Sequence, residues 1–149
     1  SISEHAPSAE IFHFSGHGWS DGGNGGLILP ATARGPRFLT SAELSGQNWR
    51  RCSLAVLSAC LTASGEARGA VNNRSLVRAF LGAGARRVIA ARWSVDSEAT
   101  RLLMDGFYDR LARREPPAEA LAGAEAAVSA VRRWKHPYYW AGFQIFENL

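Results

Sequence analysis

Hydrophobic residues along the chain follow two kinds of pattern, and together these patterns predict a sheet covered by helices. Continuous apolar runs of strand length lie at Leu54–Leu57 and Val88–Ala91, as is typical of strands that are buried on both faces. Helical spacing of apolar residues appears at 72–81 and 97–113, and the aromatic-rich Tyr139–Phe146 predicts a last strand. Because strands alternate with helices, we expect an α/β fold with a mostly parallel sheet covered on both faces.

Local signals mark where several helices begin and end. Thr40–Glu43 fits the capping box that opens a helix. Pro116–Pro117 suits the first turn of a further helix, where a missing backbone N–H costs nothing. Gly82 and Gly84 follow the 72–81 helix as a C-terminal glycine signal. These helix ends are therefore set by their own local sequence.

The N-terminal third is rich in glycine and gives weaker strand signals. Ile11–Phe14 is a β-rich run that we expect to stop at Ser15–Gly16. Six of the eleven positions in Gly16–Gly26 are glycine, which predicts a mobile loop or a close approach of backbone to another group. Leu27–Leu29 predicts a short strand, and Phe38–Leu39 is the segment that we expect to pair with it.

Composition narrows the classes of protein to which the chain can belong. Of 149 residues, 46% are hydrophobic and 20% are charged, which fits a single folded domain. No apolar run approaches the roughly 20 residues of a membrane-spanning helix, and no N-terminal segment resembles a secretory signal. The two cysteines, Cys52 and Cys60, are too few for a disulfide framework. We therefore expect a cytoplasmic protein with no membrane partner.

The positive charge is dispersed along the chain. Lysine and arginine together number 17 against 13 acidic residues, for a net charge of +4, and Lys135 is the single lysine. The arginines occur in short pairs mixed with acids, and do not form the continuous basic stripe that tracks a phosphate backbone. A nucleic-acid partner is therefore not favoured.

Candidate chemistry lies where the predicted strands end. In a parallel sheet, active sites collect at the carboxyl ends of the strands, which here are Ser15–Gly18, Ser58–Cys60 and Trp93–Asp96. The first contributes His17 and the second contributes Cys60. If the two strands are neighbours, these side chains face each other across one crevice.

A histidine beside a cysteine is the minimum needed for catalysis by a thiol nucleophile. The thiolate attacks, and a nearby imidazolium lowers the thiol pKa from about 8.5. His17 would also protonate the leaving amine, and the backbone N–H of Gly18 suits an oxyanion hole because no side chain blocks it. The alternatives are a buried core cysteine and a hydrogen-bonded turn histidine. Cys52 has no neighbouring histidine, so we interpret it as structural or incidental.

Two other chemistries fit less well. His13, His17 and Cys60 could bind zinc, but no fourth ligand is evident, and we expect His13 to be buried inside its strand. Ser20–Gly26 has the glycine content of a phosphate-binding loop but lacks the Lys-Ser/Thr pair that follows one. We interpret it as a mobile flap beside His17 and Cys60, with a plain surface loop as the alternative.

Four segments together resemble the CHAT-domain family, whose members are bacterial and eukaryotic relatives of caspases and separases, named for their association with tetratricopeptide repeats. The resemblance runs from about Ile11 to Phe146, nearly the whole chain. The segments, in chain order, are HFSGHG at 13–18, LSACLTA at 57–63, GAGARRVIAARWSVD at 82–96 and HPYYWAGF at 136–143.

The resemblance implies a caspase-like three-layer α/β/α sandwich over residues 1–149 and a cysteine endopeptidase that needs no metal or organic cofactor. It matches the catalytic histidine to His17, the nucleophile to Cys60, and the oxyanion hole to the backbone N–H groups of Gly18 and Cys60. Family members usually carry further elements before the histidine motif. We therefore expect missing N-terminal elements, and a partner segment or regulatory chain in addition to the protein substrate.

The resemblance also implies a pocket for the side chain that precedes the cut. The residue two before the nucleophile lines that pocket, and Ser58 stands there, small and neutral, so we expect an uncharged pocket. Trp93 is either a pocket wall or a core aromatic. Asp96 either receives a basic side chain or caps the 97–113 helix, which we favour. The rival function is a catalytically silent scaffold that binds or regulates partner proteins.

Overall fold

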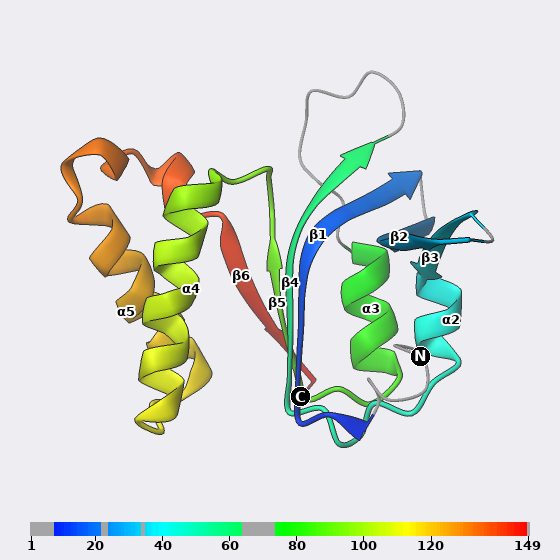
Figure 1. The fold of residues 1–149 in the computed structure, drawn as a ribbon. Coiled ribbons are helices and arrows are strands. Elements are labelled where there is room, and N and C mark those ends of the chain that lie inside the picture. The colour runs from blue at the N-terminus through cyan, green and yellow to red at the C-terminus, as the bar shows by residue number, and fades with distance from the viewer. Residues whose placement is uncertain (1–7, 22–23, 34, 64–73, 149) are drawn as a thin grey trace. The chain divides into compact units, whose positions relative to one another are not determined.

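The computed structural model describes residues 8–21, 24–33, 35–63 and 74–148 (Figure 1). The chain falls into two compact units, the first holding a six-stranded sheet and the second a pair of helices. In chain order the elements are β1 (Ile11–Asp21), β2 (Asn24–Thr32), β3 (Gly35–Thr40), α2 (Ser41–Ser45), β4 (Leu54–Ala63), α3 (Arg74–Gly82), β5 (Arg87–Ala91), α4 (Ser97–Ala112), α5 (Pro117–Ser129), the 3-10 turns η2 (Arg132–Trp134) and η3 (Pro137–Tyr139), and β6 (Phe143–Glu147).

The first unit, Ser1–Ser94 with Gln144–Leu149, is built on a mixed sheet. Its strand order is β3-β2-β1-β4-β5-β6. β1, β4 and β5 are parallel neighbours, whereas β2 and β3 add to them antiparallel. β6 also runs antiparallel to β5, since Glu147 near its end pairs with Arg87 at the start of β5, Nε to Oε1 at 2.5 Å. The expectation of a mostly parallel sheet is therefore wrong, although the α/β class is confirmed.

Connection length explains why the sheet is mixed. Only residues 22–23 separate β1 from β2, and only residues 33–34 separate β2 from β3. Connections this short join antiparallel strands, because a parallel pair needs a crossover of a dozen or more residues. β4 and β5 are joined through α3, which is such a crossover. Parallel pairing is therefore confined to the middle of the sheet.

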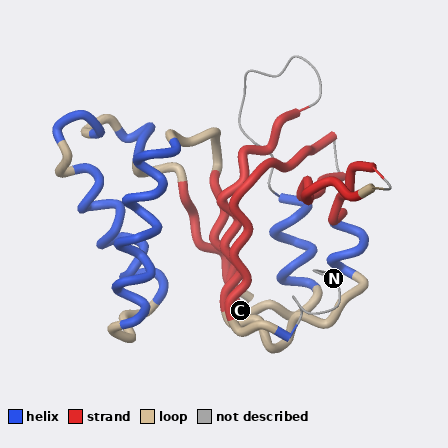
Figure 2. Tube along the Cα trace, in the orientation of Figure 1, coloured by secondary structure: helices blue, strands red, loops and turns tan. Residues whose placement is uncertain are grey.

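The helices α2 and α3 cover one face of this sheet, as the tube trace shows (Figure 2). Three aromatic rings form the centre of the core there: the Trp49 and Phe80 centroids lie 4.7 Å apart, and Phe12 lies 5.2 Å from Trp49. Trp49 donates its indole N–H to the Leu44 carbonyl at 3.2 Å, so its polar atom is satisfied inside the core. The strand residues in the same core include Ala55, Leu57, Val88 and Ala90, all at most 1% exposed.

The glycine-rich segment forms a hairpin. β1 does not stop at Phe14 but runs on to Asp21, and β2 starts at Asn24, so the predicted loop is wrong for the described residues of Gly16–Gly26. The alternative prediction, a close approach of backbone to another group, is confirmed at Gly25 and Gly26. A Cβ at Gly26 would lie 2.6 Å from Nε1 of Trp19, and one at Gly25 would lie 2.6 Å from Oγ of Ser75.

The local signals at helix ends are confirmed. Thr40 and Glu43 form a full capping box: the Thr40 N–H donates to Oε2 of Glu43 at 2.8 Å, and the Glu43 N–H donates to Oγ1 of Thr40 at 3.2 Å. After α3, Gly84 has a φ of +106°, and a Cβ there would lie 2.7 Å from Cγ of Arg50. Both the backbone conformation and the close approach therefore require glycine at 84.

The second unit, Val95–Phe143, is a pair of packed helices followed by two 3-10 turns. α4 and α5 contact each other at Gly106, where a Cβ would lie 3.8 Å from that of Ala124, an ordinary van der Waals distance. The predicted helices and their apolar faces are confirmed. The last strand begins later than predicted, at Phe143, because η3 occupies Pro137–Tyr139.

Candidate active site

The strand register brings the two predicted catalytic positions to the same level of the sheet. β1 and β4 pair in parallel from Ile11 opposite Leu54 up to Ser20 opposite Ala63, and within this register His17 lies opposite Cys60. Neighbouring strands lie about 4.8 Å apart, and directly opposed positions share one face of the sheet. The side chain of Cys60 lies outside the described part of the structure. The backbone positions of His17 and Cys60 are thus adjacent.

Both positions lie inside strands and not after them. We expected β4 to end before Ser58, but it continues to Ala63 because it pairs with the equally long β1. The register between β4 and β5 is shorter and reaches only Leu57 opposite Ala90. Among the described residues, the part of β4 that carries Ser58 and Cys60 therefore pairs on its β1 side alone. This end of β4 is the carboxyl end at which sites in such sheets form.

His17 and Gly18 differ in exposure although they are neighbours. His17 is exposed on the sheet face opposite α2 and α3, whereas Gly18 is buried. Gly18 lies between Leu27 of β2 and Leu61 of β4, so strands flank it on both sides. An imidazole at this place has room for a substrate.

His13 lies on the same sheet face as His17, because side chains of a strand alternate. It is in β1 as predicted, but it is exposed and not buried, since its face of the strand is the one away from α2 and α3. Although much of its surface is exposed, protein atoms around the imidazole partly desolvate it, and this lowers its pKa below the usual value. Four strand residues span about 13 Å, too far for His13 and His17 to share a metal ion. No metal-binding group of three His, Cys, Asp or Glu residues occurs within the described ranges.

Cys52 is a core residue, as interpreted from the sequence. It is a free thiol with no exposed surface, and burial raises its pKa. Its backbone is fixed as well, since its N–H donates to the Trp49 carbonyl at 2.8 Å and its carbonyl accepts from the Arg86 N–H at 3.0 Å. A thiol in this setting stays protonated and unreactive.

The three predicted pocket residues lie in different settings. Ser58 lies opposite Ser15 and is half-buried, two residues before Cys60 and on the same face. Trp93 belongs to the first unit, where the Arg92 guanidinium lies 5.8 Å from its ring centroid. Asp96 belongs to the second unit.

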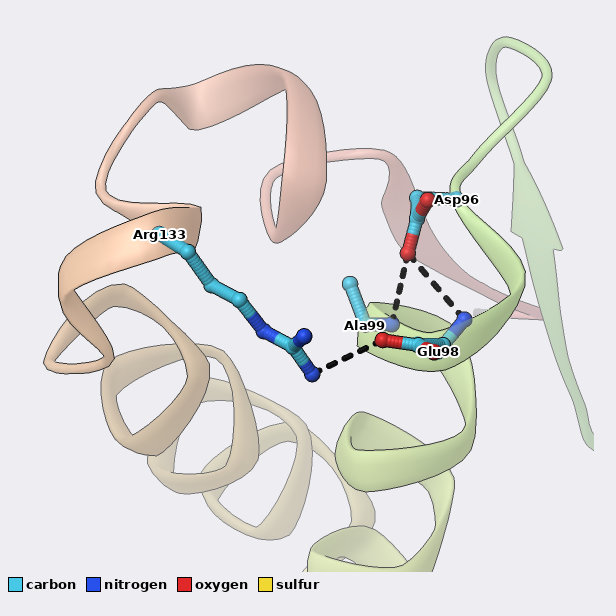
Figure 3. Close-up of polar contacts among 4 residues, drawn as sticks. All are labelled: Asp96, Glu98, Ala99 and Arg133. Carbon is cyan, nitrogen blue, oxygen red and sulfur yellow. Dashed lines mark hydrogen bonds and ion pairs between the residues drawn. The ribbon is translucent and has the colours of Figure 1, made fainter.

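The helix-cap interpretation of Asp96 is confirmed. Its Oδ1 accepts hydrogen bonds from the N–H groups of Glu98 at 3.1 Å and Ala99 at 2.9 Å, as Figure 3 shows. Arg133 holds the same turn from the other side through an ion pair with Glu98 at 2.8 Å, and its guanidinium lies 4.0 Å over the ring of Trp134. An exposed ion pair thus links the start of α4 with η2, the segment that follows α5.

Two residues beside His17 were not singled out from the sequence. Ile28 of β2 lies directly opposite His17, and Phe38 of β3 lies directly opposite Ile28. Phe38 is 46% exposed. The signal in the sequence is the run Leu27–Leu29, which is apolar on both faces of a strand, but only the register shows which residue stands beside the histidine.

The comparisons with known proteins agree with this fold. The model of the CHAT domain family matches residues 1–148. The chain belongs to the CHAT-domain family. This CHAT domain is 36% identical over 111 residues to mouse tetratricopeptide repeat protein 28, covering 72% of the chain and 4% of that protein. It is 35% identical over 71 residues to the human protein of the same name, covering 48% of the chain and 3% of that protein.

The family identity supports the caspase-like α/β class of the CHAT domain. The domain spans only a few per cent of the length of the tetratricopeptide repeat proteins that it matches. No helix within the described ranges is long and apolar enough to cross a membrane.

Proposed function

We propose that this CHAT domain is a cysteine endopeptidase in which Cys60 is the nucleophile and His17 is the general acid and base. The observation that carries the proposal is the parallel register that sets His17 opposite Cys60 at the carboxyl ends of two neighbouring strands. Family membership supports it, because CHAT domains are related to cysteine peptidases. The exposure of His17 supports it too, since a substrate must reach the imidazole.

In the proposed reaction, the Cys60 thiolate attacks the carbonyl carbon of the scissile bond, and a C–S bond forms. The carbonyl oxygen becomes an oxyanion. His17, protonated when it took up the thiol proton, gives that proton to the leaving amine as the C–N bond breaks. Water then attacks the thioester with His17 as base, releasing the carboxylate product and restoring the thiol. The proposal needs no metal or organic cofactor.

The oxyanion hole is assigned to the backbone N–H groups of Gly18 and Cys60. Gly18 leaves room for a substrate oxygen because it has no side chain. It is flanked by β2 and β4, so the proposal requires the pairing around Gly18 to loosen when a substrate binds. The proposal includes the three-layer arrangement expected of the family, with a helical layer on each face of the sheet.

We propose that the pocket for the substrate side chain before the scissile bond is uncharged. Ser58 precedes the nucleophile by two positions and carries no charge, and Trp93 is the proposed pocket wall. The carboxylate of Asp96 already accepts two backbone N–H groups of α4, so we assign it the capping role and not the binding of a basic side chain. The proposed partners are a protein substrate and an N-terminal regulatory segment or chain, in the cytoplasm.

Alanine variants of the two cysteines test whether Cys60 is the nucleophile. The Cys60→Ala variant is expected to lose all detectable cleavage of a peptide library, and the Cys52→Ala control to keep it, at a cost of about 1 kcal/mol in stability. Cleavage is followed by mass spectrometry of the products. Persistence of cleavage in Cys60→Ala would refute the mechanism.

The second candidate is the silent scaffold. The relatives are named for their tetratricopeptide repeats and not for a catalytic activity. A scaffold predicts that wild-type protein cleaves no peptide and that an electrophile modifies Cys60 no faster than free cysteine. Fast modification of Cys60 that requires His17 supports the peptidase.

A further inference from the structure

The pairing register continues past the catalytic pair into the hairpin. From β4 across β1 and β2 to β3, it aligns Cys60, His17, Ile28 and Phe38 in one row. With neighbouring strands about 4.8 Å apart, Ile28 lies about 5 Å and Phe38 about 10 Å from His17, on the side away from Cys60. Because opposed positions share a face, His17, Ile28 and Phe38 lie on one surface.

The hairpin part of this row is apolar where polar residues are the norm. Leu27 and Leu39 point into the core and are 0% and 3% exposed, so they account for the burial needs of these strands. Ile28 is only half-buried and Phe38 is 46% exposed. The open face of an antiparallel pair is usually polar. One exposed apolar residue is ordinary, but here two lie directly opposite each other beside His17.

Trp19, in β1, borders this apolar surface on one side. Trp19 lies opposite Gly26, two residues beyond His17 along β1 and on the same face. A Cβ at Gly26 would lie 2.6 Å from Nε1 of Trp19, so the indole lies over the glycine. The side chain of Trp19 therefore extends across β2 toward β3, along the edge of the surface formed by Ile28 and Phe38.

The proposed role of His17 determines which part of a substrate contacts this surface. His17 protonates the leaving amine, so the peptide that follows the scissile bond lies on the His17 side, away from Cys60. An extended chain advances about 3.3 Å per residue. The first two or three residues after the bond therefore cover the 5–10 Å over which Ile28 and Phe38 lie.

We propose that Ile28 and Phe38, bordered by Trp19, form an apolar subsite for the residues immediately C-terminal to the scissile bond. The preferred substrates are then proteins with large apolar side chains after the cut. This inference rests on the proposed peptidase function, because that function supplies the occupant and its direction.

Binding of product peptides tests the subsite without requiring cleavage. The probes are two fluorescein-labelled hexapeptides with a free amino terminus, beginning Leu-Leu or Ser-Ser and sharing one polar tail. Their affinity for the wild-type chain is measured by fluorescence anisotropy. We expect the Leu-Leu peptide to bind roughly tenfold more tightly, as for other apolar pockets.

Matched variants test whether Ile28 and Phe38 cause the preference for the Leu-Leu peptide. Ile28→Thr and Phe38→Thr are expected to reduce it to less than threefold, whereas Ile11→Thr is expected to retain it. Ile11 is a good control because it is 46% exposed and lies on the same face of β1, about 20 Å from His17 along the strand.

Three results would overturn the inference: equal affinity of the wild type for both peptides, a preference that survives both hairpin variants, or a preference that Ile11→Thr removes equally. Dimerisation that Phe38→Thr abolishes would also overturn it, by assigning the surface to a second copy. Failure of the peptidase proposal is measured separately, as the absence of cleavage by the wild type or its persistence in Cys60→Ala, so the two failures are distinguishable.

Discussion

The two faces of β1 carry different side chains, since one face packs into the core and the other is exposed. Toward α2 and α3 the strand presents Phe12, whose ring lies 5.4 Å from that of Phe80 at the centre of the core. Away from those helices it presents His13, Ser15 and His17, all exposed. Because successive side chains of a strand point to opposite faces, six consecutive residues serve both stability and the proposed chemistry. The two properties can therefore be changed independently.

The largest effect is expected from a substitution on the exposed face of β1, and it is a loss of peptide cleavage. His17→Ala is expected to lower kcat/KM for peptide cleavage by about 10²–10⁴, the usual contribution of a general acid and base. The melting temperature is expected to stay within about 2 °C of the wild type, because the side chain is exposed. His13→Ala is the matched control, a histidine on the same strand and face, and should keep cleavage within threefold. Equal losses in both variants would contradict the assignment of His17.

On the covered face, the expected loss is of stability. Phe80 is fully buried, and its ring contacts both Phe12 and Trp49. Phe80→Ala is expected to lower the free energy of unfolding by about 3–5 kcal/mol, measured by urea denaturation followed through tryptophan fluorescence. The exposed Phe38→Ala serves as the control and should change it by less than about 1 kcal/mol. Similar losses in the two variants would mean that the faces are not separable.

The smallest effect is a pH dependence on the open face. Partial burial lowers the pKa of His13 in the folded chain below its ordinary value of 6.5. As the pH falls through about 6.5, the unfolded chain therefore binds a proton more readily than the folded chain, and stability declines. His13→Thr is expected to flatten this decline, by less than about 1 kcal/mol because solvent screens an exposed group. Urea denaturation of both proteins at pH 7.5 and 5.5 measures it, and a variant whose change in stability between the two values equals that of the wild type would contradict it.

Much of the fold followed from patterns that act over short distances. Apolar runs predicted β4 and β5, helical spacing predicted α3, α4 and α5, and the capping box at Thr40 was confirmed. The glycine hairpin was not predicted, because the reason for Gly25 and Gly26 is their contact with Ser75 and Trp19. Contacts of this kind depend on tertiary structure, so the glycine content indicated a loop or a close approach of backbone without deciding between them.

In the candidate site, too, local sequence predicted some features and tertiary structure decided the others. His17 and Cys60 were singled out by residue type and by their position near strand ends, and the register then set them side by side. His13 was expected to be buried because the sequence does not say which face of a strand is covered. Ile28 and Phe38 went unnoticed for a related reason, since their place beside His17 depends on two antiparallel registers.

The place of the helical unit in the chain has a consequence for how this domain can vary. β5 and β6 are hydrogen-bonded neighbours, yet all of the second unit except Phe143, the first residue of β6, lies between them in sequence. The helices α4 and α5 thus form part of the connection between two adjacent strands, which leaves β5 at its end and returns at the start of β6. The length of this connection can therefore change without altering the pairing register of the strands that it joins.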